Sequence, residues 1–159
     1  MFHIGDKIVY PAHGIGIIER IEDKTFVGTK KSFYIIKILE NGVTIMTPLD
    51  NADKVGLRCV ACKEDIKKVL KILGKDVSIR LNENWNRRQK DYFNKIKTGS
   101  LFEIAEVYRD LCLLQIEKDL SFGERKMLEN VRYLIVSEIA EAKGIEVKKA
   151  EKLIKKALY

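Results

Sequence analysis

A chain of 159 residues, 46% hydrophobic and 33% charged, is long enough to bury one sizeable core or two small ones and is expected to be soluble. No apolar run approaches the roughly 20 residues that cross a bilayer, and residues 1–6 lack the features of a signal peptide, so we expect a cytoplasmic protein that does not contact a membrane. The net charge is +7, and residues 61–159 carry 22 cations against 16 anions, so a polyanionic partner is expected there, although an ordinary lysine-rich surface would give the same excess.

Residues 1–58 have the pattern of a small β domain. Strands are expected at 6–10, 16–22, 33–39 and 43–47, separated by turns at 11–14, 27–30 and 41–42. Asn41-Gly42 is a strong signal for a two-residue hairpin loop, and Pro48 should end the last strand. Short strands joined by close turns predict a strongly bent sheet or barrel, whose edge strands could pair with another protein.

After a joint at residues 56–62 the hydrophobic period changes from two to 3.6 residues. Helices are expected from about 63 to Gly74, from 84 to 97, from 101 onward, from 122 to Gly144 and from 147 to 158, with a loop at 75–83. Two S-x-x-E sequences, at 100–103 and 121–124, predict capping boxes. The chain is therefore expected to be α+β, with a β domain at 1–58 and a compact bundle of about five helices at 59–159.

The segment that opens the helix at 84–97 combines the only tryptophan, Trp85, with a cluster of cations. Between residues 85 and 97 the cations are Arg87, Arg88, Lys90, Lys95 and Lys97, against the single anion Asp91. Cations that neutralise phosphates, next to an aromatic ring that can press on a base or sugar, are the groups that a nucleic-acid contact requires. Asn84 is expected to cap this helix and to place Trp85 in its first turn.

Trp85 also fits a position in the core. On a helix it lies on the same side as Tyr92 and Ile96, which form an apolar stripe. Its polar neighbours on both sides, and its place at the start of the stripe, favour exposure instead. The pattern alone leaves both roles open.

Motifs for catalysis or metal binding are weak. Cys59 and Cys62 have CxxC spacing, but there is no second pair to complete a zinc site, and we see no strand-to-helix context for a redox motif. Phosphate-binding and dinucleotide-binding glycine motifs are absent from the sequence, and two histidines offer few choices for a general base. We therefore expect neither an enzyme nor a bound metal or cofactor, and we expect free thiols.

Five segments, taken in order, resemble the CarD/CdnL family of bacterial transcription regulators. They are GDKIVYPAHGIG at 5–16, PLDNADKVGLR at 48–58, NWNRR at 84–88, AEVYRDL at 105–111 and LSFGERKML at 120–128. Because they span nearly the whole chain in the order of the family, the resemblance is specific. The first segment alone would be less so, since transcription-repair coupling factor contains a related domain.

The resemblance implies a Tudor-like β domain that binds the β subunit of RNA polymerase. It also implies a helical domain that contacts promoter DNA at the upstream edge of the melted region, where Trp85 would wedge into the minor groove. Basic residues that match family positions near DNA are Arg87, Arg88, Lys90 and Arg125. Residues in the region that contacts the polymerase are Lys24, Ile45 and Met46.

Two positions depart from the family. Met46 stands where some relatives carry an arginine that helps to hold the polymerase, and Leu114 stands where some carry another DNA-facing basic residue. We therefore expect docking that relies more on backbone pairing and apolar contact, and a smaller DNA footprint.

The expected function is that of a monomeric regulator that is tethered to RNA polymerase, binds promoter DNA weakly and without strong sequence preference, and stabilises the open promoter complex. Two alternatives remain. One is a stand-alone, non-specific DNA-binding protein, and the other is a protein-interaction adaptor whose basic face only keeps it soluble.

Overall fold

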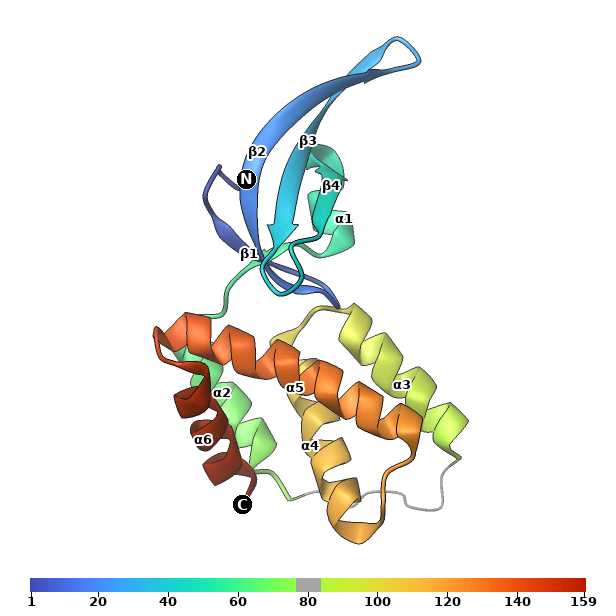
Figure 1. Cartoon of the computed structure of the whole chain (residues 1–159), viewed down its shortest axis with the longest axis vertical. Coiled ribbons are helices and arrows are strands. Elements are labelled where there is room, and N and C mark those ends of the chain that lie inside the picture. The colour runs from blue at the N-terminus through green and yellow to red at the C-terminus, as the bar shows by residue number, and fades with distance from the viewer. Residues whose placement is uncertain (77–83) are drawn as a thin grey trace. The chain divides into compact units, whose positions relative to one another are not determined.

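The structure is a computed structural model that describes residues 1–76 and 84–159, so most of the loop expected at 75–83 lies outside it (Figure 1). The chain divides into two compact units, Met1–Val60 and Ala61–Tyr159. The first unit is a β-sheet and the second a bundle of helices, as expected from the change in hydrophobic period. Each unit has its own buried core.

The first unit is an antiparallel sheet with the strand order β4-β3-β2-β1-β5. Its strands are β1 (Lys7–Tyr10), β2 (Gly14–Phe26), β3 (Thr29–Ile38), β4 (Thr44–Pro48) and β5 (Arg58–Cys59). The core lies on one face of this sheet, where Ile8, Ile18 and Ile36 are fully buried. Ala52 and Leu57, from the segment after β4, are buried in the same core.

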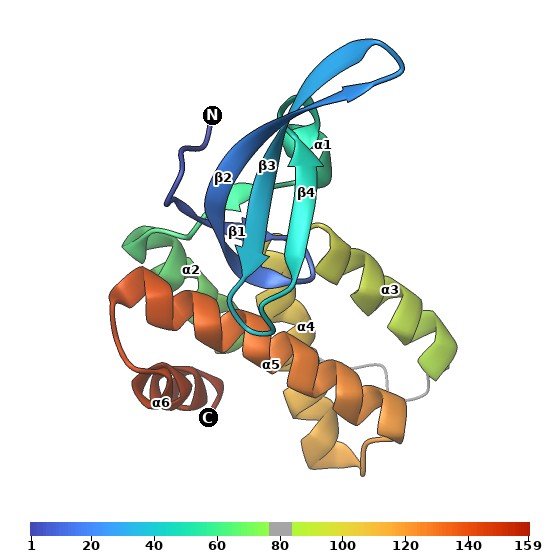
Figure 2. The same ribbon diagram turned by 45° about the horizontal axis from the view of Figure 1, so that its top comes forward.

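The sheet is bent by its two long strands. A β-bulge at Glu19 shifts the register between β2 and β3, because Ile18 faces Ile36 whereas Arg20 faces Ile35. Beyond the bulge the two strands continue as a curved ribbon to the pair Phe26–Thr29, as Figure 2 shows. Both strands are longer than the sequence pattern predicted. The prediction was too short because the outer halves of the strands are exposed on both faces, so apolar and polar residues do not alternate there.

The connection between β3 and β4 differs from the prediction. Asn41-Gly42 does form the turn, but the loop runs from residue 39 to 43 and is not a two-residue hairpin. The Asn41 side chain accepts a hydrogen bond from the backbone N–H of Val43 at 3.0 Å, which makes a local Asx-turn and lengthens the loop.

Three short elements after β4 were not predicted. They are a 3-10 helix at Leu49–Asn51, the helix α1 (Ala52–Val55) and β5. Gly56 ends α1 with a φ of 90°, a conformation that suits glycine. Elements this short span too few residues to show a periodic pattern. Their stability comes from packing against the sheet, which the local sequence does not reveal.

The second unit confirms the expected bundle, with five helices in its described residues. They are α2 (Lys63–Leu73), α3 (Trp85–Lys97), α4 (Leu101–Glu117), α5 (Phe122–Lys143) and α6 (Val147–Leu158). The core between them includes Leu111, Leu114, Val131, Ile135 and Ile139, all with an exposed fraction of 0%. None of the described helices combines the length and the apolar character that a membrane crossing requires.

One of the two capping boxes expected from the sequence forms in the structure. Ser121 and Glu124 form the predicted capping box of α5, and Gly144 ends that helix with a φ of 65°. The capping box predicted at 100–103 is wrong, although α4 does begin at Leu101. The backbone N–H of Ser100 donates instead to the hydroxyl of Thr98 at 3.2 Å, so a nearer acceptor replaces Glu103.

The ends of α2 carry two further features. Cys62 is its N-cap and Cys59 lies in β5, so the CxxC sequence does run from a strand to a helix start, and both thiols are free and exposed. At the other end, Gly74 approaches α6 so closely that a Cβ atom would lie 3.0 Å from the carbonyl oxygen of Ala157. A larger residue at this position would push α6 away.

The tip of the β2–β3 ribbon gives the first prediction. Val27 and Gly28 have φ angles of 47° and 76°, as in a type I′ turn, and such an angle is strained for a β-branched residue. Val27→Asn should stabilise the ribbon by about 1 kcal/mol and slow amide hydrogen exchange at the tip roughly five-fold. Thr25→Asn, at an exposed strand position, is the control and should not slow it. Equal exchange rates in Val27→Asn and the wild type would contradict the predicted strain.

Candidate nucleic-acid interface

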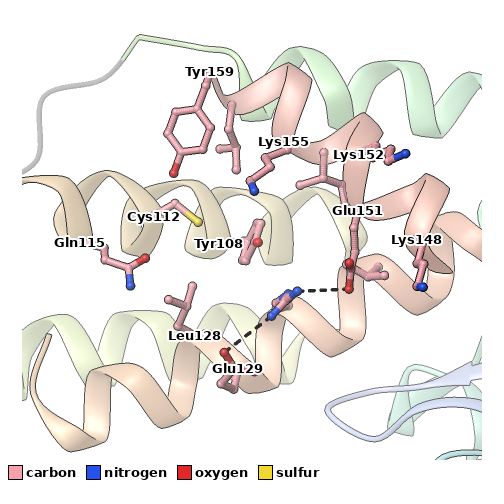
Figure 3. A pocket seen from close by; sticks show the side chains of 14 residues that line it. Tyr108, Cys112, Gln115, Leu128, Glu129, Lys148, Glu151, Lys152, Lys155 and Tyr159 are labelled. Carbon is pink, nitrogen blue, oxygen red and sulfur yellow. Dashed lines mark hydrogen bonds and ion pairs between the residues drawn. The ribbon is translucent and has the colours of Figure 1, made fainter.

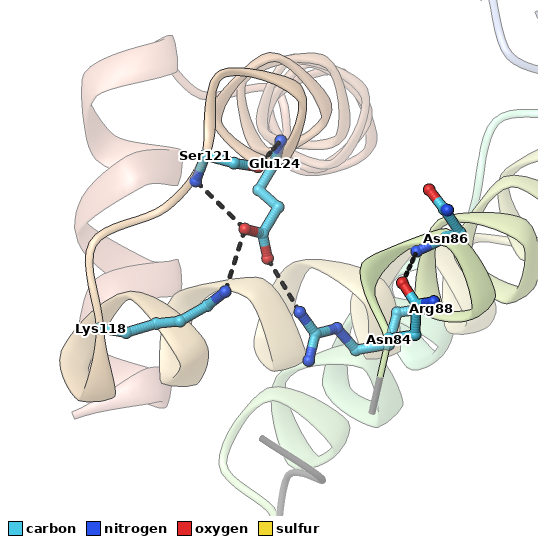
Figure 4. A network of polar contacts seen from close by, with 6 residues as sticks. All are labelled: Asn84, Asn86, Arg88, Lys118, Ser121 and Glu124. Atoms are coloured by element: carbon cyan, nitrogen blue, oxygen red, sulfur yellow. Dashed lines mark hydrogen bonds and ion pairs between the residues drawn. The ribbon is translucent and has the colours of Figure 1, made fainter. Parts of the chain in front are cut away.

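Trp85 is the first residue of α3 and is half-buried. The side chain of Asn84 accepts a hydrogen bond from the backbone N–H of Asn86 at 3.1 Å, so Asn84 caps the helix as predicted (Figure 4). The indole packs against the edge of the helical core and lies beside Gly123, where a Cβ atom would be 3.6 Å from its Nε1 and Cζ2 atoms. Trp85 is therefore neither sealed in the core nor fully exposed. One part of the indole packs against the core, and another part is exposed to solvent.

Arg88 differs from the other cations of α3 because it is buried, with 4% of its surface exposed. Its Nη2 atom lies 3.3 Å from Oε2 of Glu124, which is 1% exposed. This ion pair joins the first turn of α3 to the first turn of α5 (Figure 4). The guanidinium carbon also lies 6.0 Å from the centroid of the indole ring of Trp85.

Arg88 was expected near the DNA backbone, and in this structure it does not face solvent with the other cations. The reason lies in the helix period, because Arg88 follows Trp85 by three residues and precedes Tyr92 by four, and so falls on the buried stripe. The helix period of the sequence therefore favours burial of Arg88, whereas the match to a family position favours contact with DNA.

The Glu124 carboxylate has two further donors. Its Oε1 atom accepts a hydrogen bond from the backbone N–H of Ser121 at 3.1 Å and one from the Lys118 ammonium at 3.2 Å (Figure 4). Burial alone would raise the pKa of Glu124, but the hydrogen bonds from Ser121 and the charge of Lys118 outweigh burial and lower the pKa below its ordinary value of 4.5. Glu124 is therefore ionised at neutral pH despite its burial.

The remaining predicted cations are exposed. Arg87 and Lys90 lie on the outer side of α3, and Arg125 lies in the first turn of α5, two residues after Gly123. The last two cations of the cluster have partners on the protein. Lys95 pairs with Glu106 at 2.8 Å, and the Lys97 ammonium lies 4.5 Å from the centroid of the Phe93 ring.

Sequence reasoning missed Phe122, which is 76% exposed at the first position of α5. It directly precedes Gly123, the residue beside the indole of Trp85, so it adds an exposed apolar side chain to the first turn of α5. The available signal was its place beside the serine cap, because a large side chain at the first position of a helix has no preceding turn to cover it. Leu114, in contrast, is fully buried in the core and contributes nothing to this surface.

The residues expected to contact the polymerase lie on the sheet of the first unit. Lys24 on β2 and Met46 on β4 are both exposed, and the Lys24 ammonium lies 3.8 Å from the Met46 sulfur, so the structure brings them together. Ile45 precedes Met46 on β4, so its side chain points to the opposite face of the sheet. There it packs against the core of the first unit and is half-buried. β4 is also an edge strand of the sheet, with one side unpaired among the described residues.

The buried ion pair gives a prediction for stability. Arg88→Met should lower the free energy of unfolding by roughly 3 kcal/mol, because it leaves the Glu124 carboxylate buried with one donor fewer. Lys90→Met, on the exposed side of the same helix, should change it by less than about 0.5 kcal/mol. Urea unfolding followed by circular dichroism measures both values, and equal losses in the two variants would contradict this assignment of Arg88.

The lowered pKa of Glu124 gives a prediction for pH dependence. A carboxylate whose pKa is lower in the folded state contributes stability above its unfolded value, near 4.5, and loses this contribution as the pH falls through the folded value. The difference in unfolding free energy between the wild type and Glu124→Gln should therefore be largest near neutral pH and shrink below about pH 4.5. Glu117→Gln, at an exposed position of α4, is the control. A difference that grows on acidification would show that the sign is reversed.

Comparisons with known proteins cover both units. Residues 2–61 match the CarD-like/TRCF RID domain family, and residues 68–155 match the family of the CarD C-terminal domain. The putative transcription factor YdeB of Bacillus subtilis (strain 168) is 41% identical over 148 residues, which cover 93% of this chain and 96% of YdeB.

Two solved structures of N-terminal domains are also similar to this chain. CdnLNt from Myxococcus xanthus is 45% identical and covers 41% of this chain and 92% of its own, with a TM-score of 0.35. The N-terminal domain of Myxococcus xanthus CarD is 29% identical and covers 37% of this chain and 79% of its own, with a TM-score of 0.33. Because both units match CarD families in order, and a relative of nearly equal length is 41% identical, the chain belongs to the CarD/CdnL family of transcription regulators, with a Tudor-like N-terminal unit.

Proposed function

We propose that this regulator binds the β subunit of RNA polymerase through its first unit, contacts promoter DNA through its second, and stabilises the open promoter complex. The observation that carries the proposal is the half-buried indole of Trp85, held at the start of α3 beside exposed cations. Membership of the CarD/CdnL family, whose N-terminal domain is shared with transcription-repair coupling factor, supports the polymerase as the partner.

The geometry around Trp85 suits an apolar wedge. A side chain that separates base pairs must present a flat apolar surface and must not fold back when it meets the DNA. The Asn84 cap and the Arg88–Glu124 ion pair fix the first turn of α3, and Gly123 leaves room for the Nε1–Cζ2 edge of the indole to approach α5 closely. Trp85 is thus supported from behind while part of its surface remains exposed.

The exposed cations suit phosphate contacts. Arg87 and Arg125 lie on the first turns of two helices that meet at the indole, and Lys90 lies one turn further along α3. These helix ends carry partial positive charge, which adds to the attraction for phosphate. Contacts of this kind hold a protein in register on DNA without reading the sequence, so we propose weak, largely sequence-independent binding.

The first unit would supply the localisation that weak DNA binding lacks. An exposed edge strand, β4, can pair with a strand of a partner, and Met46 and Lys24 add apolar and cationic contacts on the same sheet. Once this unit is bound, the second unit experiences a high local concentration of promoter DNA. Docking therefore rests on backbone pairing and apolar contact at the position where some relatives carry arginine.

Stabilisation of the open complex requires only a difference in affinity. A ligand shifts the equilibrium between closed and open promoter by the amount to which it prefers one of the two states. If Trp85 fits the opened minor groove and not the closed duplex, a preference of about 1.4 kcal/mol changes the ratio ten-fold. The protein would need no catalytic group for this action.

The test measures polymerase binding and open-complex lifetime separately. Trp85→Ala should shorten the lifetime several-fold while the retention of the protein on polymerase β subunit stays unchanged, because the wedge and the polymerase contact lie in different units. Phe93→Ala, which removes another exposed aromatic from α3, is the matched control and should keep the wild-type lifetime. Lys24→Glu should weaken both polymerase retention and open-complex lifetime, whereas Lys37→Glu, at an exposed position of β3, should weaken neither.

Other outcomes would favour the two alternative functions. Tight duplex binding without polymerase, with a salt slope of roughly −0.9 per neutralised phosphate, would indicate a stand-alone DNA-binding protein. Unchanged promoter opening in the double variant Arg87→Glu, Lys90→Glu would indicate an adaptor without DNA contact. Arg88 is left out of this variant because its replacement would also disturb the buried ion pair.

A further inference from the structure

A cavity of about 580 Å³ opens between α4, α5 and α6 of the second unit (Figure 3). Its volume lies within the range of roughly 300–1,000 Å³ that is typical of small-molecule sites. The floor is formed by the buried side chains of Tyr108, Cys112, Leu128, Val136 and Ile154. The α3 residues of the DNA-contact site, including Trp85, are not part of its lining.

The rim of the cavity is cationic. Four cations line it, Arg132, Lys148, Lys152 and Lys155, together with two anions, Glu129 and Glu151. Arg132 occupies both carboxylates, since it lies 3.1 Å from Glu151 and 3.9 Å from Glu129. The three lysines have no carboxylate partner among the described residues, and Figure 3 shows the Lys155 amino group directed toward Tyr108 and Cys112.

The floor of the cavity is electrically neutral. Burial raises the pKa of the Cys112 thiol to about 11, so the thiol stays protonated at neutral pH. Burial likewise raises the pKa of Tyr108 well above its ordinary value of 10. A protonated thiol is a poor nucleophile, so the chemistry of the floor suits binding rather than covalent reaction.

A neutral apolar floor beneath an unpaired cationic rim is complementary to one class of ligand. From this arrangement we infer that the cavity binds a small amphipathic anion, with an apolar or aromatic body on the floor and a carboxylate, sulfonate or phosphate at the lysines of α6. An extended polyanion such as DNA would use a row of exposed cations and would have no use for the apolar floor. This inference is independent of the proposed polymerase and promoter contacts.

The experiment uses the full chain and two probes that share an aromatic body. 8-Anilinonaphthalene-1-sulfonate carries the anion, and N-phenyl-1-naphthylamine has the same rings without it. Fluorescence titration should show saturable binding of the sulfonate at one site and at least several-fold weaker binding of the neutral probe. Amide NMR shifts caused by the sulfonate should fall on α4, α5 and α6.

A pair of double variants tests the role of the rim. Lys152→Gln with Lys155→Gln should weaken sulfonate binding about five-fold, the effect of losing contacts worth about 1 kcal/mol. Lys149→Gln with Lys156→Gln makes the same change of charge on exposed residues of α6 that do not line the cavity, and should leave affinity within about two-fold. Circular dichroism checks that both variants fold.

Several results would overturn the inference. They are the absence of saturable sulfonate binding, equal affinity for the neutral probe, equal weakening in the two double variants, or amide shifts that gather around Trp85 and Phe122 in place of the cavity.

Discussion

One buried carboxylate, that of Glu124, takes part both in the cap of α5 and in the ion pair to α3. Removing a carboxylate from water costs several kcal/mol, and this cost is offset only when enough donors surround the ion. Here the donors come from three different places: the backbone of Ser121, the side chain of Lys118 and the guanidinium of Arg88. Any motion that separates the start of α3 from the start of α5 would remove the Arg88 donor from the buried carboxylate, so the ion pair resists such motion.

This constraint explains how an exposed surface can hold a fixed shape. The apolar stripe of α3 secures its later turns in the core, but the first turn lies at the edge of the bundle, where hydrophobic contact is thin. At this position the Arg88–Glu124 ion pair, and not hydrophobic burial, holds the first turn of α3 against α5. It also separates two roles among neighbouring cations: Arg88 organises the protein, while Arg87 beside it remains on the surface.

Much of the fold followed from local signals in the sequence. The limits of α3 and α5 were predicted well because Asn84, Ser121 and Gly144 act within one turn of the chain. Signals that depend on distant partners were missed or misjudged. The short elements after β4 form only against the sheet, and the burial of Arg88 depends on a carboxylate 36 residues away. The family resemblance singled out the residues of the candidate site, but it did not indicate which of them face solvent.

The glycine at the end of α2 has a consequence for the last helix. Because Gly74 has no Cβ atom, the main chains of α2 and α6 pack closely against each other at this position, and the glycine fixes the distance between the two helices. Because α6 is also one wall of the cavity, that clearance helps to fix the width of its mouth. A Cβ atom added at Gly74 would therefore displace α6 and change the width of the cavity opening, although Gly74 itself does not line the cavity.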